Sequence, residues 1–100
     1  MIEWAAGLYE GEGTATRCKR RLRLSLRMTN EEPVRRFAAA VGYGTVYGPY
    51  KYASSDGCVR KPVWVWVAEC EDALIVADLL RPWLSNERRQ QLARVLRAPE

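Results

Sequence analysis

The chain has 100 residues, a net charge of +4 and a sequence pI of about 9.2. This length predicts a single domain over residues 1–100, which can bury a hydrophobic core but only a small one. The absence of histidine excludes Ser-His-Asp hydrolases, His-based nucleases and most zinc enzymes. The three cysteines, Cys18, Cys58 and Cys70, are widely spaced without a CxxC pair, which is typical of reduced cysteines in an intracellular protein.

The first expected element is a helix in the stretch from Trp4 to Gly13. Four of its residues share one stripe at positions i, i+3, i+4 and i+7, namely Trp4, Gly7, Leu8 and Gly11. Because glycine inside a helix costs about 1 kcal/mol relative to alanine, this stripe indicates close approach of another backbone. Glu12 ends the helix, where a carboxylate opposes the helix dipole, so its presence points to a function. The alternative is an amphipathic helix that ends in a glycine-rich turn.

A β-hairpin is expected over residues 14–28, with its turn near Lys19 and Arg20. Strict alternation over residues 21–28 predicts a strand with one dry and one wet face. The dry face carries Leu22, Leu24, Leu26 and Met28, and the wet face carries Arg21, Arg23, Ser25 and Arg27. No acids interrupt these cations, so they repel one another unless a polyanion binds, and a β-ribbon fits the major groove of DNA. The alternative is an ordinary solvated face.

A second helix and a second hairpin follow. Thr29 and Glu32 form an expected capping box, and the helix runs to Val41 before it stops at Gly42. The second hairpin starts at residues 43–47, turns at residues 54–57 and returns over residues 63–67.

The return strand alternates valine with tryptophan. Valines on one face suit packing beneath helices, which would leave Trp64 and Trp66 on the face of the arginines. The alternative places both tryptophans in the core.

Two helices complete the chain. The first is expected over residues 71–81, with buried positions at Leu74, Val76, Ala77 and Leu80. Pro82 ends it, and Ser85 caps the last helix, which buries Leu92, Val95 and Leu96. The predicted class is α+β with the order αββαββα and an additional terminal helix.

Four segments resemble the LAGLIDADG homing endonucleases. Residues 4–13 resemble the signature decapeptide in its variant ending Asp/Glu-Gly-Glu-Gly. The others are Arg27-Met28-Thr29-Asn30, Val41-Gly42-Tyr43-Gly44, and Leu79-Leu80-Arg81-Pro82-Trp83-Leu84 followed by Arg88-Arg89-Gln90. The resemblance implies the αββαββα fold of that family with an antiparallel DNA-binding saddle, and it covers nearly the whole chain.

The resemblance also implies an activity. Chains with one motif work as homodimers on near-palindromic double-stranded DNA, so the stripe of Trp4, Gly7, Leu8 and Gly11 becomes the expected dimer interface. Glu12 from each subunit, with the Gly11 carbonyl, would hold Mg²⁺ or another divalent cation for phosphodiester hydrolysis. Asn30 matches a position near the cleft that orders water in the family; the alternative is that it is only a residue of the capped first turn of the second helix. Glu10 matches a non-catalytic acid.

The expected DNA contacts fall into two groups. Arg21, Arg23 and Arg27 are candidates for guanine contacts, and Ser25, Tyr47, Trp64 and Trp66 are expected on the same surface. Phosphate contacts are expected from Arg17, Lys19, Arg20, Lys51, Arg60 and Lys61.

The sequence departs from the family pattern at the start of the last helix. A lysine is often found there, whereas this chain offers only Glu87 or Arg88, and a second basic position is Val34. Arg88 can supply charge but cannot carry a proton. A DNA-binding protein without cleavage, acting as a regulator or an intron-RNA cofactor, is therefore an alternative, and a protein-interaction domain is a third.

The expected partners are double-stranded DNA and a second copy of the chain, with no membrane and no small-molecule substrate. The expected location is intracellular, cytoplasmic in a bacterial or phage-infected cell and organellar in a eukaryote.

Overall fold

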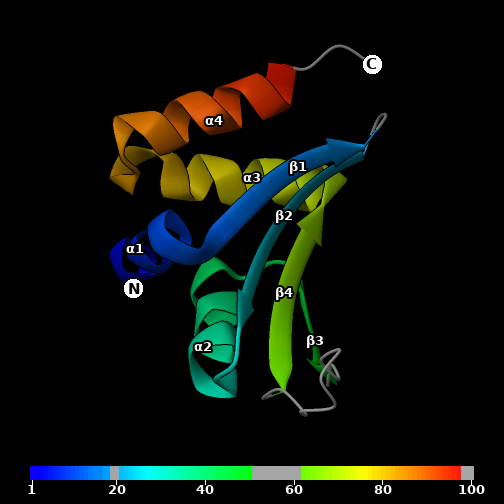
Figure 1. The fold of residues 1–100 in the computed structure, drawn as a ribbon. Helices are drawn as coiled ribbons and strands as arrows, with labels where there is room; N and C mark the ends of the chain where they lie inside the picture. Colours follow the sequence, from blue (N-terminus) through cyan, green and yellow to red (C-terminus); the bar gives the residue numbers. More distant parts are fainter. Residues whose placement is uncertain (19–20, 51–61, 98–100) are drawn as a thin grey trace, which may run out of the picture.

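A computed structural model describes residues 1–18, 21–50 and 62–97 as an α+β fold (Figure 1). The elements are α1 (Ile2–Glu12), β1 (Gly13–Cys18), β2 (Arg21–Met28), α2 (Glu31–Val41), β3 (Thr45–Tyr50), β4 (Val63–Glu69), α3 (Cys70–Leu80), the 3-10 helix η1 (Arg81–Trp83) and α4 (Asn86–Arg97). The strands form one antiparallel sheet in the order β1-β2-β4-β3. The sheet is curved, and the helices gather on one side of it. The predicted fold class and element order are confirmed.

The passage from α1 into β1 takes place without a loop, because Glu12 is the last helical residue and Gly13 the first strand residue. A Cβ atom at Gly13 would collide with the ring of Tyr9, which is fully buried. Glycine therefore lets the strand leave the helix directly over this ring. The arrangement fixes the position of Glu12 relative to the sheet.

Asn30, and not Thr29, caps α2. The Asn30 side-chain oxygen accepts a hydrogen bond from the Glu32 nitrogen at 3.2 Å, so the expected capping box is wrong by one residue. Asparagine is as good a cap as serine or threonine. With Asn30 as the cap, the helix begins at Glu31, one residue later than it would with a cap at Thr29. The predicted stop at Gly42 is confirmed, with a left-handed backbone at φ 77°.

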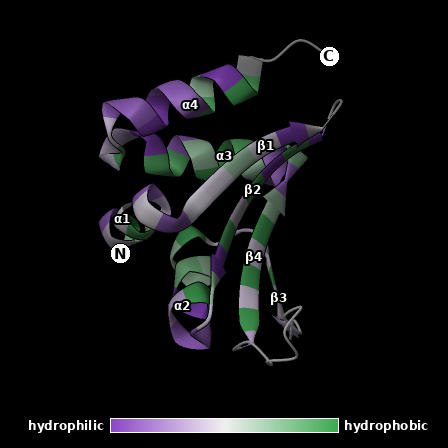
Figure 2. Cartoon of the chain, in the orientation of Figure 1, coloured by the Kyte–Doolittle hydropathy of each residue, from purple (hydrophilic) through white to green (hydrophobic). Residues whose placement is uncertain are grey.

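The core lies between the helices and the face of β2 that carries Leu22, Leu24 and Leu26. In Figure 2 much of α3 and β4 is coloured as hydrophobic (green), whereas most of α4 is coloured as hydrophilic (purple). The helices contribute two aromatic side chains and several aliphatic ones to the core, namely Ala5, Ala6, Tyr9, Val34, Phe37, Ala73, Val76, Ala77, Leu80 and Leu92.

The tryptophans of β4 face this core, so the prediction that they join the arginines is wrong. Trp66 is 0% exposed, its ring meets that of Phe37 edge-on at 4.7 Å, and its indole N–H donates to the Tyr43 carbonyl at 2.9 Å. Trp64 is half-buried, with the Arg35 guanidinium 5.4 Å from its ring centroid. Alternation alone defines two faces of a strand but does not say which one is covered.

Helix α3 buries Ala73, Val76, Ala77 and Leu80, while Leu74 is 46% exposed. The prediction of a buried Leu74 is therefore wrong, and alanine takes the buried position beside it. Among the described residues, no helix is long and apolar enough to cross a membrane.

Candidate nucleic-acid interface

The face of the sheet opposite the helices carries the arginines of β2. Cross-strand pairing places Arg27 opposite Val65, Ser25 opposite Val67 and Arg23 opposite Glu69. Tyr47 of β3 pairs with Val65 from the other side and is 47% exposed. A hollow of about 330 Å³ on this face is lined by Arg23, Arg27, Tyr47, Tyr50, Val65, Val67 and Glu69. The structure thus brings together the predicted base-contacting residues of β2 and β3.

Glu69 is a member of this surface that the sequence reasoning missed. Its carboxylate lies 3.3 Å from Arg23 and 3.7 Å from Arg21, and it therefore partly neutralises an arginine row that has no acid of its own. The sequence contains an indication of this position. Glu69 is at the same alternate positions of β4 as Val65 and Val67, and it therefore lies on the same face of the strand.

Arg17 is not part of this face, so its expected phosphate contact is wrong. Arg17 pairs with Leu22, which places it on the helix side of the sheet. Its Nε donates to the Val95 carbonyl at 2.9 Å and a terminal nitrogen donates to the Leu96 carbonyl at 3.3 Å. A cation at these carbonyls is favourable because they form the negative end of α4.

Five further expected phosphate contacts lie outside the described residues: Lys19, Arg20, Lys51, Arg60 and Lys61. Trp64 and Trp66 are excluded from the surface by their place on the core side, as described above. Ser25 is half-buried on the arginine face and stays a candidate.

Glu12 lies exposed at the last residue of α1, at the end of the open glycine stripe. Gly7 and Gly11 are exposed, and a Cβ atom at either would have no neighbour within 4 Å. Trp4 and Leu8, the two other residues of the stripe, are half-buried and pack against the core, and the buried side of the helix is formed by Ala5, Ala6 and Tyr9. Within the described chain, therefore, nothing occupies the close contact that the glycines permit.

A network of hydrogen bonds joins the end of α1 to the start of α4. The Glu10 carboxylate accepts from the Ser85 nitrogen at 2.7 Å and from the Ser85 hydroxyl at 2.6 Å. The same hydroxyl accepts from the Arg88 nitrogen at 3.2 Å, which confirms Ser85 as the cap of α4. The Ser85 side-chain hydrogen bond, followed by that of its backbone, lowers the pKa of Glu10.

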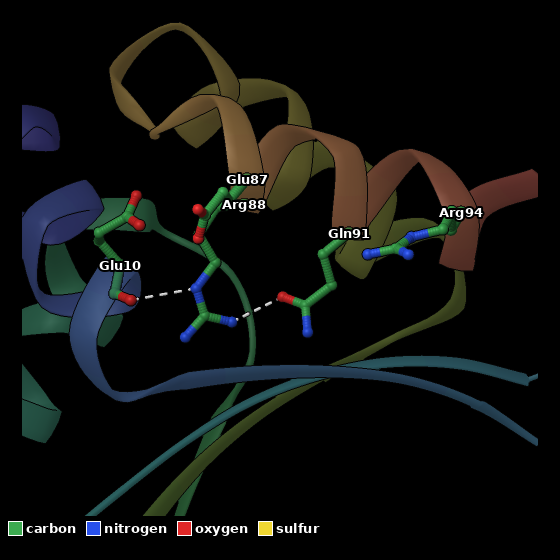
Figure 3. Close-up of a pocket in the computed structure, with 5 residues that line it drawn as sticks. All are labelled: Glu10, Glu87, Arg88, Gln91 and Arg94. Atoms are coloured by element: carbon green, nitrogen blue, oxygen red, sulfur yellow. Dashed lines mark hydrogen bonds between the residues drawn. The ribbon is translucent and has the colours of Figure 1, made fainter.

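Arg88 completes this network (Figure 3). Its Nε donates to the Glu10 carbonyl at 3.0 Å and a terminal nitrogen donates to the Gln91 side chain at 2.7 Å. The guanidinium also lies 5.5 Å from the centroid of the Tyr9 ring. Burial raises the pKa of Tyr9 to about 12, and Arg88 opposes that change. Arg88 thus holds the last turn of α1, two residues before Glu12.

A second hollow, of about 470 Å³, opens beside this network and is lined by Glu10, Glu87, Arg88, Gln91 and Arg94. Glu87, which with Arg88 is one of the two candidates for the position where the family pattern often has a lysine, lines it. Among the described residues, no group of three or more acidic or sulfur side chains could form a metal site. Asn30 is exposed just after β2, beyond the strand end where Leu26 pairs with Gly13, and its side-chain oxygen is engaged as the α2 cap.

The sequence has no match among models of protein families, and no curated protein matches it at a significant level. The structure does match solved proteins. The homing endonuclease I-CvuI in complex with its target in the presence of calcium has a TM-score of 0.70 and 21% identity. The same enzyme with the I-CreI target and magnesium, its DNA not cleaved, has a TM-score of 0.70 and 20% identity. The archaeal intron-encoded I-Vdi141I complexed with DNA has a TM-score of 0.64 and 16% identity.

These matches cover 91–95% of this chain but only 62% of each of the other chains. The chain therefore spans about three fifths of the length of the solved proteins it matches. At these identities the likeness concerns the fold. The TM-scores of 0.64–0.70 over nearly the whole chain show that it has the LAGLIDADG homing endonuclease fold.

Proposed function

We propose that the chain is a homodimeric, site-specific DNA endonuclease of the homing type that uses a divalent metal. The observation that carries this proposal is the place of Glu12. Its exposed carboxylate lies at the end of a helix with an open glycine stripe, directly where the chain enters an arginine-bearing sheet. The solved neighbours, which share the fold, are named as complexes with DNA.

The uncovered sheet face supports DNA as the substrate. Arg21, Arg23 and Arg27 are exposed on it, and Tyr47 lies in the same surface. Arginine pairs with guanine in a bidentate manner in the major groove, and a β-sheet is among the elements that enter that groove. The sheet is curved in Figure 1, and a curved surface can follow the outline of a DNA duplex.

The open stripe of α1 supports a two-fold dimer. A second copy of the chain placed against Gly7 and Gly11 meets no side chain at either glycine, so the two helices approach closely. An isologous contact of this kind brings the two Glu12 residues together at a common helix end. It also joins two arginine faces into one surface, which matches a near-palindromic site.

The donor set around Glu12 fits a hard cation that binds with DNA. Mg²⁺ retains several waters and is held by one or two carboxylates together with substrate phosphates. Glu12 and the Gly11 carbonyl of each subunit would hold such an ion, which when bound would activate water and stabilise charge on the phosphate. Within the described chain, no ion pair or hydrogen bond engages the Glu12 carboxylate. Asn30 is the candidate for orienting water, and Arg88 positions the helix end through the Glu10 carbonyl.

A DNA-binding protein without cleavage is the second candidate. Glu87 lines the hollow beside the α1 end, and a carboxylate there repels a phosphate. The lysine that the family pattern often has in this stretch is absent. Arg88 is engaged with Glu10 and Gln91, and because a guanidinium stays protonated it does not replace a proton carrier.

The test is an incubation of the protein with a library of long randomised duplexes, with Mg²⁺ or with a chelator. An endonuclease produces Mg²⁺-dependent cuts at enriched sites, and Glu12→Gln abolishes the cuts while it retains binding. Glu71→Gln, an exposed acid in the first turn of α3, serves as the matched control and should cut normally. Enriched sites that stay uncut in Mg²⁺ would support the second candidate and contradict the first.

A further inference from the structure

Two valines lie on the uncovered face of the sheet, among its charged and hydroxyl-bearing residues. Val65 pairs with Arg27 and Tyr47, and Val67 pairs with Ser25 and Thr45. Both valines line the hollow on this face. Val65 is 9% exposed between its larger neighbours, whereas Val67 is half-buried between two small side chains and is therefore the more accessible of the two.

The side chains around Val67 are of the kinds that recognise base edges in the major groove. Val67 pairs with Ser25 of β2, and Arg23 and Arg27 lie two residues before and after Ser25. The two arginines are therefore the diagonal neighbours of Val67, about 7–8 Å away across the strand pair. Both arginines are exposed. An apolar floor thus lies between two side chains that suit guanine.

The major groove presents only one apolar group on its base edges, the 5-methyl group of thymine. Apolar side chains discriminate thymine through contact with this methyl, whereas arginine and glutamate do not benefit from it. The two valines are the apolar side chains on the floor of this hollow, and the remaining lining is charged or phenolic. High β-propensity also favours valine in strands, so a dependence on the methyl group itself is needed to separate the two explanations.

We infer that Val67, with Val65 beside it on the same face of β4, contacts a thymine methyl group in each half of the DNA site. This thymine would lie next to the guanines contacted by Arg23 and Arg27. The inference rests on the proposed function and names its substrate more closely. It requires thymine at a fixed position of each half-site, recognised through its methyl group and not through its hydrogen-bonding pattern.

The experiment compares duplexes that contain thymine with otherwise identical duplexes that contain deoxyuridine. Sites are first enriched from a randomised duplex library by binding without divalent metal. Each thymine of an enriched site is then replaced, one at a time, by deoxyuridine, which removes the methyl and keeps every hydrogen-bonding group. We expect one position in each half-site at which this replacement weakens wild-type binding about fourfold, as the loss of one buried methyl predicts.

Three variants assign this effect to the valine. Val67→Ser removes both methyl groups and presents a hydroxyl, and it should bind the thymine and deoxyuridine duplexes equally. Val67→Ile stays apolar and should retain the difference. Val63→Ser, on the same strand but outside the hollow lining, should also retain it. Thermal melting of each variant verifies that it is folded.

Equal binding of wild type to both duplexes at every position would overturn the inference, as would a difference that persists in Val67→Ser. In either case, Mg²⁺-dependent cutting of the enriched duplex that is lost in Glu12→Gln would leave the proposed function standing. A library that yields no enriched site removes both proposals together.

Discussion

The Glu10 carboxylate accepts two hydrogen bonds from Ser85, at 2.7 Å from the backbone nitrogen and 2.6 Å from the hydroxyl, and it thereby joins the last turn of α1 to the first turn of α4. The two residues are 75 positions apart in the chain. The acid thus has a structural task, distinct from that proposed for Glu12.

Replacing Glu10 should therefore lower stability without removing a metal ligand. Glu10→Gln loses the charge of an acceptor that serves two donors, and we expect the free energy of unfolding to fall by about 1–2 kcal/mol. Chemical denaturation of the wild type and the variant measures the difference. Glu87→Gln, at an exposed acid of the same helix turn as Ser85, is the control and should change little. An unchanged midpoint for Glu10→Gln would contradict the expectation.

The same carboxylate predicts a dependence on pH. Its folded-state pKa is lowered from the ordinary value of 4.5, so its contribution is fully present above that value and is lost as the pH falls through the folded-state pKa. We expect the melting temperatures of wild type and Glu10→Gln to differ at neutral pH and to converge in acid below pH 4.5. A gap that stays constant over this window would show that the hydrogen bonds do not depend on ionisation.

The glycine stripe of α1 separates the stability of one chain from self-association. Gly7→Ala meets no neighbour within the described chain and improves helix propensity by about 1 kcal/mol, so a single chain should be at least as stable as before. Self-association should weaken, because the added methyl keeps the second helix away. Sedimentation at several concentrations and thermal melting in dilute solution measure the two effects.

Leu79→Ala is the control for that experiment. Leu79 is an exposed apolar residue on α3, away from the stripe, and its loss should leave association unchanged. A Gly7→Ala variant that associates as tightly as wild type, or a Leu79→Ala variant that does not associate, would place the interface elsewhere.

Two arginines on opposite faces of the sheet should give opposite phenotypes. Arg17→Ala removes two hydrogen bonds to α4 carbonyls, so it should lower stability by about 1–2 kcal/mol and leave the salt dependence of DNA binding intact. Arg27→Ala should leave stability unchanged and weaken site-specific binding by about 1–3 kcal/mol. Titration of labelled duplex at several salt concentrations, alongside thermal melting, distinguishes these outcomes. A stable Arg17→Ala variant with a reduced salt slope would return Arg17 to the DNA surface.

The order of elements was predictable because it depends on local patterns. Alternation over residues 21–28, the turn at Gly42 and the cap at Ser85 are each properties of a few neighbouring residues, and each is confirmed. The resemblance of four segments to one family anticipated the fold that the solved structures share.

The assignment of faces was not predictable in the same way. Alternation in β4 admits either the valines or the tryptophans as the buried set, and the choice depends on the register of β4 against β2. Trp66 fits the core because Gly44 leaves room for its indole, a relationship between a residue of β4 and one in the bend before β3. Arg17 was misplaced for the same reason, since its face follows from its pairing with Leu22. Contacts between distant segments decide these cases.

The junction at Gly13 has a mechanical consequence. Because α1 continues into β1 without a connecting loop, a change in the angle of the helix should change the angle of the hairpin. In the proposed dimer on DNA, the position of Glu12 would therefore depend on how the strands bind the duplex as well as on how the two helices cross. A duplex that fits poorly would move Glu12 away from that of the second copy, so we expect sequence discrimination to affect the proposed cutting step as well as binding.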